Sequence, residues 1–156
     1  MVAKKWILLT SMFLLIGIFL LSYFIKGIST DPKMLIRLEP KNLSLVNLGE
    51  IVYQNNCSSC HGSNLEGQKN WKERDADGYM PAPPHDQTGH TWHHNDQYLF
   101  NITKYGIEKS LQLNYPNNMP IYDDVLTDIE ILASLSYIKS KWPEKIQKIH
   151  DEMNSN

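Results

Sequence analysis

The feature that most constrains the fold is a run of five residues, Cys57-Ser58-Ser59-Cys60-His61, which contains both cysteines of the chain. A C-x-x-C-H motif is the signature of covalent haem attachment. Two thiols on one helical turn can reach the two vinyl groups at one edge of a porphyrin, and the next residue then presents an imidazole to the iron. The motif therefore predicts one haem c, attached at Cys57 and Cys60 with His61 as an iron ligand, and a domain built around it.

Other uses of paired cysteines fit the sequence less well. A zinc site needs a second Cys or Cys/His pair, and only the histidines at 90–94 remain to supply one. A thioredoxin-like pair follows a strand in a βαβ unit, and no strand pattern precedes Cys57. A disulfide framework would use more cysteines at longer spacings.

The N-terminal end holds an uncharged apolar stretch of 20 residues, Trp6 to Ile25, between Lys5 and Lys26. As a helix it would span ~30 Å, the thickness of a bilayer core. A cleaved signal peptide is the alternative, but such peptides have a shorter apolar core and a small-x-small cleavage site, which this stretch lacks. We therefore expect an uncleaved transmembrane anchor.

Breakers and helix signals divide the chain into five parts. We expect a short stub at 1–5, the anchor at 6–25, a polar linker at 26–41, a haem domain at 42–143 and a charged C-terminal tail at 144–156. The domain should contain helices at 42–56, 96–105 and 127–141. A capping box at Thr127 and Glu130 begins the last of these, and Pro143 stops it. Because no β pattern is present, the expected fold class is all-α.

Charge is distributed unevenly along the chain. Three of the 15 Lys and Arg residues, Lys4, Lys5 and Lys26, flank the apolar stretch, so the remaining 12 accompany all 17 Asp and Glu, a net charge of −5. Nucleic-acid binding needs a basic footprint, so this composition argues against a nucleic-acid partner. An acidic domain suits a partner with a positive docking face, since opposite fields raise encounter rates.

From Gly49 to Pro143 the chain resembles class I cytochromes c. GEIVYQNNCSSCHGSNLEGQ is similar to their first helix, attachment site and following loop, and NNMPIYDDVLTDIEILASLSYIKSKWP is similar to their distal methionine loop and C-terminal helix. GYMPAPPHDQTGHTWHHNDQYLF resembles a subgroup of small membrane-anchored bacterial haem proteins. The resemblance implies a class I cytochrome c fold. It also implies a haem domain on the extracytoplasmic (periplasmic) side of the cell membrane, where haem is attached to such proteins, with residues 1–5 in the cytoplasm.

The resemblance implies that Met119 is the second axial ligand, because Met119-Pro120 lies shortly before the helix at 127–141, as in the methionine loop of the family. Histidine/methionine ligation raises the reduction potential relative to two histidines. Met80, which is also followed by proline, is one alternative, and a loop histidine is the other.

Two further pairs of residues take their expected roles from the family. In the family, a proline carbonyl accepts a hydrogen bond from the ring N–H of the axial histidine that does not face the iron. Pro83 is the residue of this chain that best matches that proline, with Pro84 as the alternative. Gly49 and Tyr137 resemble the pair at which the first and last helices cross closely.

The loop at 62–96 is rich in Gly and Pro, lacks periodicity and carries four histidines, namely His85, His90, His93 and His94. Long ordered loops usually carry function, and histidine is the commonest metal ligand, so the loop could hold a second metal such as copper or zinc. In the other interpretation these histidines pack around the haem, bond its propionates or cap the next helix. Adjacent residues point different ways, so convergence of all four on one ion is disfavoured.

We expect an electron carrier rather than an enzyme. The chain has no second haem motif, no flavin or nicotinamide fingerprint and no paired catalytic carboxylates. Its partners would be other redox proteins, such as a membrane-bound oxidase or dehydrogenase complex. One alternative is a metal-handling or redox-sensing module that uses the histidine loop. Another is an enzyme with an open iron position, such as a peroxidase.

Overall fold

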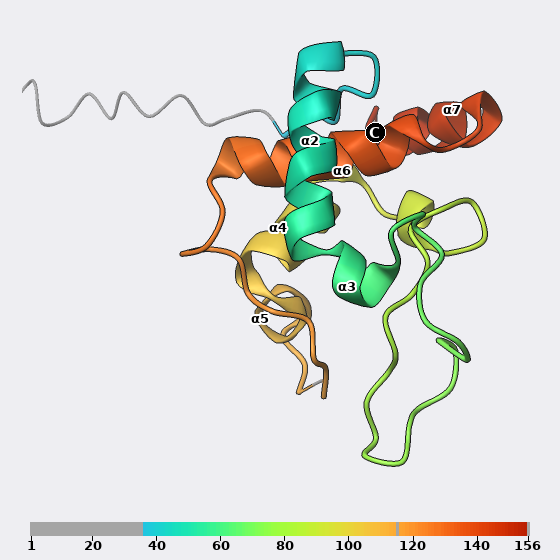
Figure 1. The fold of residues 1–156 in the computed structure, drawn as a ribbon, viewed down its shortest axis with the longest axis vertical. Coiled ribbons are helices and arrows are strands. Elements are labelled where there is room, and N and C mark those ends of the chain that lie inside the picture. Colours follow the sequence, from blue (N-terminus) through green and yellow to red (C-terminus); the bar gives the residue numbers. More distant parts are fainter. Residues whose placement is uncertain (1–35, 115, 156) are drawn as a thin grey trace, which may run out of the picture. The chain divides into compact units, whose positions relative to one another are not determined.

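The computed structural model describes residues 36–114 and 116–155. All regular elements in these ranges are helical, as Figure 1 shows. They are α2 (Leu43–Asn56), α3 (Ser58–His61), the 3-10 turn η1 (Thr91–His93), α4 (Asp96–Tyr105), α5 (Ile107–Leu111), α6 (Asp128–Ser140) and α7 (Glu144–Met153). The expected all-α class is confirmed.

Local capping explains where the three predicted helices begin. The side chain of Asn42 accepts the amide of Leu45 at 3.2 Å at the start of α2, and Asn95 accepts the amide of Tyr98 at 2.8 Å at the start of α4. Thr127 opens α6 with a complete capping box, in which the Glu130 carboxylate accepts the Thr127 amide at 2.8 Å. Each cap satisfies amides that the first helical turn leaves without partners.

Helices α2 and α6 cross in direct contact (Figure 1). Gly49 lies at the crossing, where a Cβ atom would overlap the carbonyl of Ala133 and lie 2.9 Å from the Cβ of Tyr137. Only glycine lets the two backbones approach this closely. The Gly49–Tyr137 contact implied by the family resemblance is therefore present.

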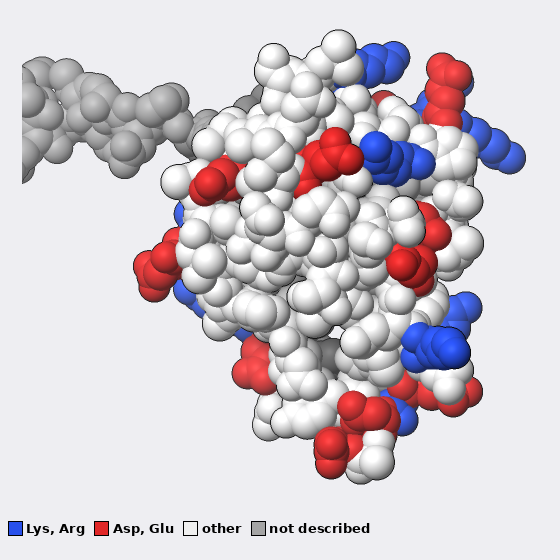
Figure 2. All heavy atoms as spheres, in the orientation of Figure 1, with Lys and Arg blue, Asp and Glu red and all other residues white. Residues whose placement is uncertain are grey.

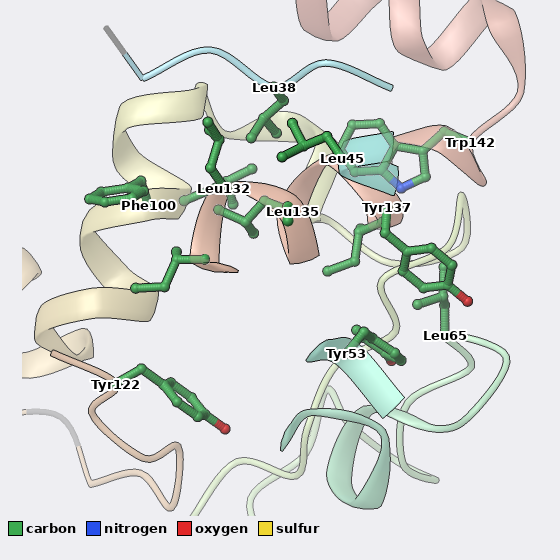
Figure 3. Close-up of a cluster of buried hydrophobic side chains, with 14 residues drawn as sticks. Leu38, Leu45, Tyr53, Leu65, Phe100, Tyr122, Leu132, Leu135, Tyr137 and Trp142 are labelled. Atoms are coloured by element: carbon green, nitrogen blue, oxygen red, sulfur yellow. The ribbon is translucent and has the colours of Figure 1, made fainter. Parts of the chain in front are cut away.

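The core lies between these helices and α4. Figure 3 shows its side chains, including Tyr53 of α2, whose ring lies 5.5 Å from that of Tyr137. Its most deeply buried apolar members are Leu38, Tyr53, Leu65, Ile131, Ala133, Ile138 and Trp142. Tyr53 is fully buried although it lies four residues before Cys57, so the core extends to the edge of the attachment motif.

The structure differs from the expected domain boundaries at both ends. Residues 144–153 form helix α7 instead of a charged tail, and its His150 is completely buried. The last part of the expected linker also belongs to the domain, because Leu38 is in the core and its amide donates to the Asp96 carboxylate at 2.9 Å. The compact unit accordingly extends from Ile36 rather than from residue 42.

The anchor expected at 6–25 lies outside the described residues. Within 36–114 and 116–155, no helix combines the length and the apolar character that crossing a membrane requires.

Candidate functional site

The attachment motif forms a short helical turn that continues from α2. Cys57 lies between α2 and α3, and the Sγ atom lies 4.0 Å from Oγ of Ser134 on α6. Cys57 is half-buried and Cys60 is exposed, and neither forms a disulfide. Burial raises the pKa of the Cys57 thiol, an effect that the contact with Ser134 opposes. Two thiols on one turn, one facing the core and one facing outward, fit the two thioether bonds of a covalent haem.

His61 ends this turn with a buried imidazole. Its Nδ1 lies 2.8 Å from the carbonyl oxygen of Pro83. A carbonyl can only accept, so Nδ1 carries the proton and Nε2 keeps the lone pair that a metal requires. Burial lowers the pKa of His61, which the hydrogen bond to Pro83 partly offsets, so the ring is neutral at pH 7.

Backbone hydrogen bonds hold Pro83 beside His61. The amide of Gln68 donates to the Ala82 carbonyl and the amide of His85 donates to the Leu65 carbonyl, each at 2.8 Å. Gly67 permits this approach, because its φ is +67° and a Cβ there would overlap the backbone of Pro84. The segment after the motif is therefore paired with the segment that carries Pro83.

Tyr122 connects the methionine loop to the attachment turn. Its hydroxyl donates to the carbonyl of Asn56, the residue before Cys57, at 2.7 Å. Burial, followed by the proximity of Cys57 and Cys60, raises the pKa of Tyr122 to about 12. Met119, three residues earlier, is half-buried, and its amide donates to Oδ1 of Asn117 at 3.2 Å.

Met80, the alternative methionine, lies in the loop at 66–82. In Figure 1 the loop at 66–82 lies on one side of α3, and the segments at 112–114 and 116–126 lie on the other. Met80 is half-buried, as Met119 is. Burial therefore does not separate the two candidates. Both segments are tied to the motif, the Met119 segment through Tyr122 and Asn56 and the Met80 segment through Pro83 and His61.

The four loop histidines each stack on another ring. The pairs are His85 on His61, His90 on Trp71, His93 on Trp92 and His94 on Tyr98, with centroid distances of 3.9, 5.3, 3.6 and 4.4 Å. In the part of the chain that the structure describes, no three His, Cys, Asp or Glu side chains are grouped so that they could hold a metal ion. The second metal site therefore stays a prediction from the sequence, and the geometry points to packing for these rings.

Two hydroxyl contacts at the site were not foreseen. Tyr122 is one, and Tyr53 is the other, because its hydroxyl donates to the carbonyl of Gly62 at 2.8 Å. The helical spacing of four residues between Tyr53 and Cys57 is a signal that could have revealed the second contact. These bonds hold the carbonyls immediately before and immediately after the motif.

Comparison with protein families gives one match. The family model described as Cytochrome c matches residues 46–142, which include the attachment turn, the methionine loop and α6. The chain belongs to the cytochrome c family. It is a monohaem class I cytochrome c with covalently attached haem c, and such a domain is an electron carrier rather than an enzyme. No curated protein and no solved structure matched the chain.

Proposed function

We propose that this cytochrome is a membrane-anchored carrier that passes single electrons between redox proteins outside the cytoplasm, with His61 and Met119 as the axial ligands of its iron. The observation that carries this proposal is the buried imidazole of His61, whose Nδ1 lies 2.8 Å from the Pro83 carbonyl, in the same turn as the two cysteines of the attachment motif. When bound, the haem supplies an iron that changes between the ferric and ferrous states while both ligands stay in place.

The residues around the motif keep the geometry constant between the two states. The Pro83 carbonyl fixes the tautomer of His61 and the direction of its ring. Tyr53 and Tyr122 hold the backbone on either side of the two cysteines. A carrier benefits from such rigidity, because little has to move when the iron gains or loses an electron.

Support for Met119 comes from the Tyr122 hydrogen bond, which holds the methionine loop at the turn carrying both cysteines. The test is the absorption spectrum of the oxidised protein. Met119→Ala should abolish the thioether-to-ferric charge-transfer band at the red end of the visible spectrum, whereas the matched control Met80→Ala should retain it. Loss of the band in the Met80 variant alone would transfer the axial role to Met80.

The anchor rests on the 20 uncharged residues from Trp6 to Ile25. The full chain, expressed in a bacterium that matures c-type haem, should stay in the membrane pellet after an alkaline wash and should have an intact mass that includes residues 1–25. External protease should release the haem domain from spheroplasts. A soluble haem protein that lacks the N-terminal segment would instead indicate a cleaved signal peptide.

The proposed partners are redox proteins with a basic docking face, such as a membrane-bound oxidase or dehydrogenase complex. The segment after Lys26 has a net charge of −5. Figure 2 shows both acidic and basic side chains around one face of the domain, whose centre, over α3, has few charges. Electron transfer to such a partner should slow as ionic strength rises, because salt screens the attraction that brings the two proteins together.

A further inference from the structure

We propose that His85 is a positioning residue for the iron ligand. Its ring, stacked on His61, fixes the rotation of the His61 imidazole about the bond to the iron. This inference rests on the proposed function, because it takes His61 as the axial ligand.

The stacking geometry restricts rotation of the ligand. The two ring centroids are 3.9 Å apart and the ring planes differ by 20°. An axial imidazole bound through Nε2 can turn about the Fe–N bond, and that turn would drive one edge of its ring into a parallel neighbour. The Pro83 carbonyl restrains His61 only at Nδ1, so the flat face of His85 supplies a second, independent restraint.

His85 can restrain the ring of His61 because hydrogen bonds of its own backbone and side chain fix its position. Its amide donates to the Leu65 carbonyl at 2.8 Å, and its carbonyl accepts Nε1–H of Trp142 at 2.7 Å. Its Nδ1 lies 2.7 Å from the Thr91 hydroxyl. Thr91 and Trp142 are both buried, so neither partner can readily leave.

The arrangement also explains why a histidine suits this position. A flat ring is needed to stack on His61, and a polar ring atom is needed to bond Thr91 at the same time. Phenylalanine would supply only the ring face, and glutamine would supply only the polar group. The two requirements can therefore be separated by substitution.

The orientation of the axial imidazole plane has spectroscopic consequences that are independent of stability. It sets the energies of the iron d orbitals, and hence the anisotropy of the electron paramagnetic resonance (EPR) spectrum of the ferric protein. It also sets the spread of the haem methyl proton shifts. A purely structural role for His85 would leave both quantities unchanged in any variant that takes up haem and keeps its axial ligands.

The experiment compares His85→Phe and His85→Gln in the full chain, solubilised with detergent. A pyridine haemochrome assay first confirms one covalent haem, and the charge-transfer band confirms the axial thioether. Absence of covalent haem or of the charge-transfer band in the wild-type protein would refute the proposed function rather than the role of His85.

His85→Phe should reproduce the wild-type EPR anisotropy and methyl shifts, whereas His85→Gln should give a shifted or broadened EPR signal and a changed methyl shift pattern. Wild-type spectra for the glutamine variant, or equally altered spectra for both variants, would overturn the proposal. Should His85→Gln fail to take up haem, His85→Leu decides instead, because leucine, like phenylalanine, lacks the bond to Thr91 but also lacks the flat ring face that stacks on His61. Altered spectra for His85→Leu beside wild-type spectra for His85→Phe would support the proposal, and wild-type spectra for both would refute it.

Discussion

Gly49→Ala should measurably destabilise the domain, because the new methyl group enters the crossing of α2 and α6. The Cβ would overlap the Ala133 carbonyl and lie 2.9 Å from the Cβ of Tyr137, and the overlapped group is backbone, which cannot turn away. Overpacking of a core costs ~3 kcal/mol at the upper end of the usual range. Alanine regains ~1 kcal/mol over glycine through its higher helix propensity. The net loss in the free energy of unfolding is therefore about 2 kcal/mol.

This loss can be measured on the haem-loaded protein by far-ultraviolet circular dichroism during heating. For a domain of about 120 residues, 2 kcal/mol corresponds to a decrease in Tm of ~8 °C. The matched control is Asn47→Ala, an exposed position on the same helix, which should change stability by less than ~0.5 kcal/mol. A Gly49→Ala protein as stable as the wild type would show that the helices can separate at no cost, and the packing argument would fail.

Three further predictions concern polar groups. Tyr122→Phe removes the hydroxyl that donates to the Asn56 carbonyl and should lower the free energy of unfolding in urea by ~1 kcal/mol. Unchanged stability would count against this contact. Asp151→Asn leaves the buried ammonium of Lys139 without its carboxylate at 2.5 Å and should also destabilise the domain; a neutral result would mean that water already solvates Lys139. Burial, and then the nearby Lys139, lower the pKa of His150 in the folded protein. As the pH decreases through about 6.5, His150 takes up a proton in the unfolded chain before it does so in the folded protein, so the free energy of unfolding falls. His150→Gln should reduce the slope between pH 7.5 and 5.5, and an equal slope would exclude His150 as a source.

The helices with local signals could be predicted from the sequence. Asn42, Asn95 and Thr127 are caps that act within one turn, and Pro143 is a breaker, so α2, α4 and α6 follow from neighbouring residues. The attachment turn follows for the same reason, because all of its groups lie within five residues.

Helix α7 could not be predicted in this way, because its buried face makes contacts that are distant in sequence. Nε2 of His150 donates to the carbonyl of His94 at 2.8 Å, and the His150 ring meets Trp142 edge to face at 5.1 Å. A histidine in a charged segment normally indicates solvent exposure, so the pattern predicts a tail. Only the completed fold supplies the carbonyl and the ring that make burial of His150 favourable.

The histidine loop shows the same limit at the functional site. Composition predicts that four imidazoles lie near the haem motif, but not which ring each one meets. Adjacent His93 and His94 stack on Trp92 and Tyr98 respectively, so their proximity in sequence says nothing about a shared ligand. His85 is the member of the four whose ring stacks on His61, with 3.9 Å between the two ring centroids.

Two residues that flank α6 in the sequence make hydrogen bonds that help to hold the attachment turn. Tyr122, before α6, bonds the carbonyl that precedes Cys57, and Trp142, just after α6, bonds the carbonyl of His85, which stacks on His61. Because α6 also packs across α2 at Gly49, it connects the contacts on both sides of the attachment motif. A displacement of α6 would therefore disturb the surroundings of Cys57 and those of His61 together.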